Sequence, residues 1–142
     1  MTSIEQLITQ MCEIFNASPK SAGIKYIHEF PGTKQDIPLT SPIVSVGAER
    51  VAVTRVEADT QLSDGSSASV RLKFCICVPK SLSGRACYAV FDKLMEVTET
   101  LLSKYSLTNI FTEEMKYSST VNGLILPVIM TISLGSAYTV EQ

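Results

Sequence analysis

The residues that could take part in acid–base or nucleophilic chemistry are few and far apart. His28 is the only histidine, and it lies within a β-type run of residues. A catalytic nucleophile needs an activating base beside it, and no motif in the chain supplies that pairing. We interpret His28 as a strand residue with a hydrogen-bonded ring nitrogen. The sequence predicts no catalytic residues, and therefore a protein that is not an enzyme.

The acidic residues also lack the arrangement of a catalytic or metal site. Glu113 and Glu114 fall in a run that we expect to be a strand, where successive side chains point to opposite faces. Asp59 and Asp64 share a polar segment that is typical of a solvated turn. The glycines are isolated, so the chain contains no glycine-rich phosphate loop. We predict no cofactor.

The four cysteines do not have metal-ligand spacing. The sequence contains no Cys-x-x-Cys, and its single histidine lies far from every cysteine. Free cysteine packs as a small hydrophobic residue. We therefore expect no metal site and predict buried free thiols at Cys12, Cys75, Cys77 and Cys87.

Hydrophobic periodicity predicts two helices and a series of strands. Ser3 and Gln6 form a potential capping box for a helix that ends near Asn16–Pro19. A second helix is expected over 83–105, with Ser81 or Ser83 as its N-cap. The predicted strands cover 24–30, 43–46, 51–56, 69–78, 110–117 and 124–134.

The order α-β-β-β-β-α-β-β indicates the α+β class. We expect residues 1–142 to form a single domain, a mainly antiparallel twisted sheet with two helices packed on one face. In the strand 69–78, apolar residues alternate with polar ones, so one face should contact the core. The other face changes from charged residues to thiols, which predicts that its far half is also covered.

The run 124–130 is apolar on both strand faces and has two interpretations. It can be a central strand covered by the helices and a loop, or it can be buried against another subunit, since exposed apolar patches mark interaction surfaces. Pro127 removes one backbone donor, so we expect this strand to lie at an edge or to bulge there.

Composition excludes several classes of protein. The 142 residues carry 12 basic and 14 acidic side chains, a net charge of −2, which gives no electrostatic footprint for nucleic acid. The hydrophobic fraction of 45% is too high for intrinsic disorder. No secretion signal is evident at the N-terminus, and the most apolar stretch, 124–134, is too short to cross a membrane. Only 18% of residues are charged, whereas serine and threonine fill 30 positions.

Taken together, these elements resemble the tail terminator, or tail-completion, proteins of tailed bacteriophages and phage-tail-like particles. The matching features cover nearly the whole chain and consist of element order and length. They are the capped first helix, Phe30-Pro31-Gly32, Pro42 to Val46, the hairpin loop around 59–67, the strand 70–78 ending at Pro79, the long second helix and a closing strand rich in Leu and Ile.

The resemblance implies a structural ring protein, usually a hexamer, that caps the tail tube and ends its polymerisation. Its partners would be copies of itself, the tail tube protein and, at the other surface, a head connector or the end of a contractile sheath. It would be assembled in the bacterial host cytoplasm as part of a virion or tail-like particle. A ring with head-to-tail contacts needs two different complementary patches on each subunit.

We expect the two patches in the apolar strand and in the polar hairpin loop. The candidate interface residues are Asp59, Thr60, Gln61, Leu62, Ser63, Asp64, Leu124, Leu126, Val128 and Met130. One feature departs from the family, because its lumen tends to be negative where DNA passes and the acidic residues here are dispersed. The alternatives are another neck or head–tail joining adaptor, and a small-ligand-binding regulatory α+β domain.

Overall fold

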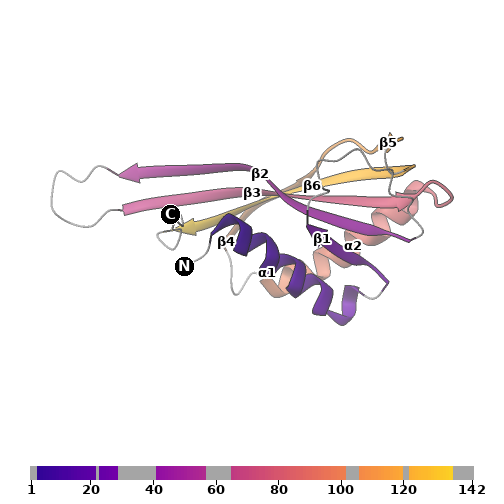
Figure 1. Ribbon diagram of the computed structural model, residues 1–142, viewed down its shortest axis with the longest axis horizontal. Coiled ribbons are helices and arrows are strands. Elements are labelled where there is room, and N and C mark those ends of the chain that lie inside the picture. Colours follow the sequence, from indigo (N-terminus) through magenta and orange to yellow (C-terminus); the bar gives the residue numbers. More distant parts are fainter. Residues whose placement is uncertain are drawn as a thin grey trace.

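The structure is a computed structural model that describes residues 3–21, 23–28, 41–56, 65–101, 106–119 and 122–135. It contains two α-helices, a short 3-10 turn and one six-stranded sheet (Figure 1). The elements are α1 (Ile4–Ala17), η1 (Pro19–Ser21), β1 (Lys25–His28), β2 (Ile43–Val56), β3 (Gly65–Pro79), α2 (Gly84–Leu101), β4 (Ser106–Thr112), β5 (Lys116–Ser118) and β6 (Gly123–Gly135).

Helix α1 begins and ends where its sequence predicts. The Ser3 side chain accepts a hydrogen bond from the Gln6 N–H, and the Gln6 side chain accepts one from the Ser3 N–H, so the capping box is confirmed. The helix buries Leu7, Met11 and Phe15 against the sheet. The Phe15 ring lies 4.8 Å from that of Tyr26 and 5.2 Å from that of Phe74, which joins α1 to strands β1 and β3.

Both helices cover the same face of the sheet (Figure 1). Helix α2 buries one stripe of residues, Cys87, Val90, Leu94 and Val97. The strand residues that meet the helices include the predicted face of β3, all of it inaccessible to solvent: Val70, Leu72, Phe74, Ile76 and Val78. The alternation of apolar and polar residues in 69–78 therefore predicts the core-facing side of β3 correctly. We call the opposite side of the sheet the far face.

The strand order is β1-β2-β3-β6-β4, with β5 also paired to β6. Every pair is antiparallel except β1 with β2. The α+β class, the mainly antiparallel sheet, the order of elements and the placement of both helices on one face are confirmed. Two details of the strands differ from the expectation, and each has a local cause.

The predicted strands 43–46 and 51–56 are two halves of one strand, β2. A β-bulge between Ala48 and Arg50 shifts the register against β3. Because a bulge adds one residue, the apolar positions change parity from Val44 and Val46 to Val51. The same shift turns Arg50 to the far face, opposite Arg71. A pattern that looked like two short strands is one strand with an added residue.

The predicted strand 110–117 is divided between β4 and β5, and the cause lies in β6. Strand β6 is not at an edge, since it pairs with β3 on one side and with β4 and β5 on the other. The Pro127 carbonyl accepts from the Glu113 N–H at 3.0 Å, so the missing Pro127 donor also faces this side. The expected edge position is therefore wrong: Pro127 sits inside the sheet, where its neighbouring strand is interrupted.

Strands β2 and β3 are too long for the helices to cover. At about 3.3 Å per residue, the 14 residues of β2 span about 46 Å. At about 1.5 Å per residue, the 18 residues of α2 span only about 27 Å. The hairpin consequently extends beyond both helices (Figure 1), and Val51 and Val53 on its helix-side face are 38% and 50% exposed.

The outer edge of β1 is sealed by a side chain. The Asn16 side-chain amide donates to the Tyr26 carbonyl and accepts from the Tyr26 N–H, each at 2.8 Å. Asn16 thus takes the place of a further strand at this edge. From the sequence, Asn16 is recognisable only as part of a helix end. Its pairing with Tyr26 is not, because the two residues lie ten positions apart in the chain.

Replacing Asn16 by alanine should destabilise the fold by about 2 kcal/mol, because two partly buried backbone groups lose their partners. Urea unfolding followed by circular dichroism measures the change. Glu13→Ala, an exposed change on the same helix, is the matched control and should stay within about 0.5 kcal/mol. Equal effects of the two substitutions would contradict the sealing role of Asn16.

Candidate functional site

The candidate interface residues of β6 lie inside the subunit. Leu126, Val128 and Met130 are at most 3% exposed and belong to the core beneath the helices. Leu124 is half-buried and packs against the same core. The run 124–130 had two interpretations. For the face that carries these residues, the structure agrees with the first, a central strand covered by the helices. The other six candidates, residues 59–64, lie outside the described residues.

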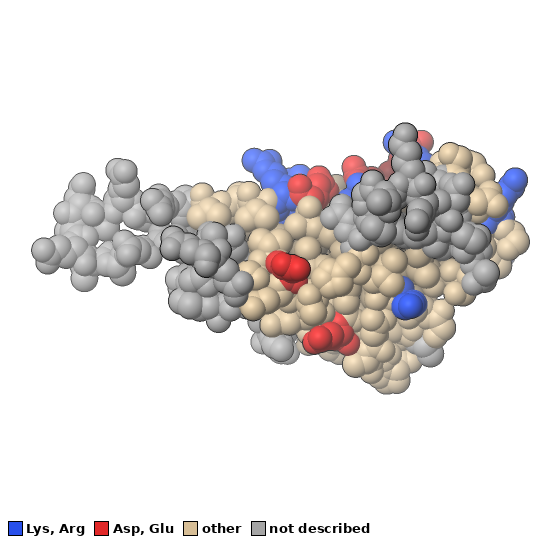
Figure 2. All heavy atoms as spheres, in the orientation of Figure 1, with Lys and Arg blue, Asp and Glu red and all other residues tan. Residues whose placement is uncertain are grey.

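The far face of the sheet is the surface that no described helix covers. One half of it is charged, with Arg50, Arg71 and Lys73 on neighbouring strands. In its other half, Cys77 and Ile129 are buried, as the change from charged residues to thiols predicts. Figure 2 shows basic and acidic side chains gathered along the far-face margin of the molecule, with fewer over the rest of that view.

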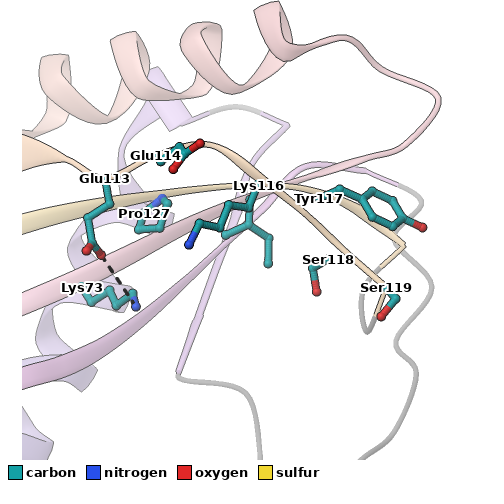
Figure 3. A pocket seen from close by; sticks show the side chains of 9 residues that line it. Lys73, Glu113, Glu114, Lys116, Tyr117, Ser118, Ser119 and Pro127 are labelled. Atoms are coloured by element: carbon teal, nitrogen blue, oxygen red, sulfur yellow. Dashed lines mark ion pairs between the residues drawn. The ribbon is translucent and has the colours of Figure 1, made fainter.

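A hollow of about 720 Å³ opens on the far face where β4 gives way to β5 (Figure 3). Its lining is mostly polar and comprises Lys73, Glu113, Glu114, Lys116, Tyr117, Ser118, Ser119, Ile125 and Pro127. The interruption of the strand opposite Pro127 creates it, because residues 113–115 leave the sheet there. Met115 packs instead against the core, next to Gly84 at the start of α2.

The two glutamates at this interruption are not consecutive strand residues, contrary to the expectation. Both line the hollow, but in Figure 3 their carboxylates point in different directions. The Glu113 carboxylate lies 4.0 Å from the Lys73 ammonium, and both side chains are well exposed. Such an exposed pair contributes at most about 1 kcal/mol, so these charges are not needed to hold the fold together.

Arg50 and Arg71 form a second charged feature, which the sequence did not indicate. They are directly opposite each other on β2 and β3, and like charges in that arrangement are destabilising. Among the described acidic side chains, none is within ion-pair distance of either guanidinium. A smaller hollow of about 180 Å³ lies between them, lined also by Ala52, Ser69 and Thr131. The bulge in β2 creates this pair.

Strand edges without a partner among the described residues lie on both sides of the sheet. Strand β1 covers only Ile43 to Val46 of β2, which leaves the edge of 47–56 open. On the other side of the sheet, the outer edges of β4 and of the short β5 are open. Strand β4 contains neither proline nor a charged residue, the residues that usually prevent an edge strand from pairing with another chain. Its one irregularity is a bulge between Leu107 and Asn109.

The remaining candidates for chemistry occupy structural positions. His28 lies on β1, and its Nε2 is 3.1 Å from the Thr9 hydroxyl, as predicted for a strand histidine with a hydrogen-bonded ring. None of the four cysteines forms a disulfide; three are buried and Cys75 is half-buried. The described residues include no group of three or more potential metal ligands. None of the described helices is long and apolar enough to cross a membrane.

Comparison with known proteins gives a similarity of fold, without a match in sequence. No family model matches the chain, and no curated protein matches its sequence. Among solved structures, the fold is similar to a chain of the "Virion of native gene transfer agent (GTA) particle", with a TM-score of 0.48 and 14% sequence identity. The aligned region covers 89% of this chain and 90% of that chain.

Burial of two ionisable core residues makes the fold sensitive to alkali. Burial raises the pKa of the Cys77 thiol from 9.0 to about 12, with smaller contributions from Cys75 and Cys87. Burial also raises the pKa of Tyr26 from 10.0 to about 12, although the nearby Ser21 hydroxyl opposes this. In both residues the folded state favours the neutral form, which is the form present below the unfolded pKa.

The contribution of these two residues to the free energy of unfolding should therefore be constant below about pH 9 and fall as the pH rises from 9 towards 12. Cys77→Ala should make this decline shallower, and Tyr26→Phe should remove the part that begins near pH 10. Urea unfolding at a series of pH values measures both. A stability that stays flat between pH 8 and 11 in the unmodified protein would contradict the prediction.

Proposed function

We propose that this chain is a structural subunit of a phage-like particle and, within that class, a tail terminator. In this role, several copies form a closed ring that caps the tail tube and ends its polymerisation. The ring presents its other surface to a head connector or to the end of a contractile sheath. Elements that carry the resemblance to tail terminators support the proposal: the capped helix α1, the strands β2 and β3, the long helix α2 and the closing strand β6.

The observation that carries the proposal is the pair of open edges on opposite sides of one sheet. The strands β2, β3, β6 and β4 alternate in direction. Because the repeat contains an even number of alternating strands, rotation about an axis along the strands places β4 of one copy antiparallel to β2 of the next. This is a head-to-tail contact between two different surfaces, which is the type that closes into a ring.

The hairpin arm supports a role in docking. The ends of β2 and β3 that adjoin their connection extend past the helices (Figure 1), and Val51 and Val53 of β2 expose apolar surface there. A ring of such subunits would carry one projecting hairpin for each copy. We assign contact with the tube to this arm and to the polar segment 59–64, which follows β2 in the sequence.

The proposal is tested by blocking the β4 edge without breaking the sheet. Since the Glu113 N–H faces β6, the N–H of the preceding Thr112 points away from β6. Thr112→Pro therefore removes an outward donor and keeps the pairing with β6. We expect the unmodified protein to have the mass of a closed ring by light scattering and Thr112→Pro to be monomeric with an unchanged circular dichroism spectrum.

The matched control is Phe111→Pro, which removes a donor that faces β6 and should lower the melting temperature. An unmodified protein that remains monomeric at high concentration would count against the ring. A monomer that binds small molecules in the hollow at Glu113 and Lys116 would instead favour the ligand-binding alternative.

A further inference from the structure

We infer that the Arg50–Arg71 pair of one subunit binds the carboxylates of Glu113 and Glu114 of the next subunit. This inference rests on the proposed ring and assigns the contact that sets its register. The occupant of the arginine hollow is thus a second copy of the same chain. The first surface carries two arginines at the open edge of β2, and the second carries two glutamates, beside Lys73 and Lys116, where β4 ends.

No described negative charge offsets the repulsion between the two arginines. Arg50 and Arg71 face each other across β2 and β3, and no described carboxylate lies within ion-pair distance of them. A carboxylate in the hollow of about 180 Å³ between them would offset this repulsion. A planar guanidinium can also bind a carboxylate through two parallel hydrogen bonds.

The two glutamates are placed to supply that charge. Both are exposed, and they follow Thr112 directly at the end of β4. Among the described cations, only Lys73 approaches Glu113, at 4.0 Å, and none lies within ion-pair distance of Glu114. Both can therefore take a new partner at little cost.

The register of the sheet indicates how far apart these groups lie. Arg50, Arg71, Thr131 and Asn109 lie on one row across the four strands. In closed sheets with a strand tilt of about 36°, each strand is displaced by about one residue relative to its neighbour, or about four over this repeat. Four residues is the separation between Asn109 and Glu113, so such a displacement brings Glu113 opposite Arg50.

Strand β1 decides the direction of the displacement. With Glu113 opposite Arg50, β4 would lie along residues 50–56 of the neighbouring β2, which are free of β1. With no displacement, β4 would lie along residues 47–53 and Glu113 would meet Val46, far from Arg50. With the opposite displacement, β4 itself would meet the segment Ile43–Val46, where β1 is already paired. The open part of the edge thus admits one direction, and it is the direction that joins the charges.

A charge exchange tests the contact. Arg50→Glu and Glu114→Arg should each weaken self-association by about tenfold or more, and the double variant should restore it. Sedimentation at several protein concentrations gives the association constant. Arg85→Glu and Glu96→Arg make the same charge changes on exposed positions of α2 and are the controls. A double variant no better than the single variants would overturn the inference.

Disulfide trapping tests the register independently. The variant Arg50→Cys with Glu113→Cys should give a ladder of linked copies on mild oxidation, whereas Arg50→Cys with Asn109→Cys should not, since a disulfide needs Cα atoms less than about 7 Å apart. If the unmodified protein forms no ring, the proposed function fails. If it forms a ring that is insensitive to both experiments, the ring stands and only this contact is wrong.

Discussion

Strands advance more than twice as far per residue as helices do, and this difference shapes the whole subunit. Two helices of 14 and 18 residues cover one face of the sheet only along part of a hairpin whose strands have 14 and 15 residues. The chain therefore buries a continuous core under the helices and leaves one face, one projecting arm and two edges without helical cover. The surfaces available for assembly are the ones that the helices cannot reach.

Single-residue irregularities in the strands place the charged groups on those surfaces. The bulge between Ala48 and Arg50 turns an arginine to the far face, where it meets Arg71. The missing donor of Pro127 coincides with the break between β4 and β5, which releases Glu113 and Glu114 from the sheet. Both irregularities cost backbone hydrogen bonds, and both produce exposed charge beside an open edge.

The two outer strands of the sheet differ: a side chain binds the edge of β1, whereas, among the described residues, the edge of β4 is open. A head-to-tail contact requires such a difference between the two sides. Asn16 occupies the outer edge of β1 by binding both backbone groups of Tyr26. Nothing among the described residues does the same for β4. The small number of charged residues fits this picture, because a surface rich in serine and threonine is less costly to desolvate than one rich in unpaired charge.

The sequence alone determined the elements whose signals are local. The capping box at Ser3, the face of β3 from Val70 to Val78 and the α+β class follow from hydrogen-bonding groups and side-chain periods within a few residues. The tertiary structure decided which face of β6 is buried, the interior position of Pro127 and the joining of 43–46 with 51–56. Each of these depends on a partner strand distant in the sequence, and a bulge changes side-chain parity without leaving a residue type that marks it.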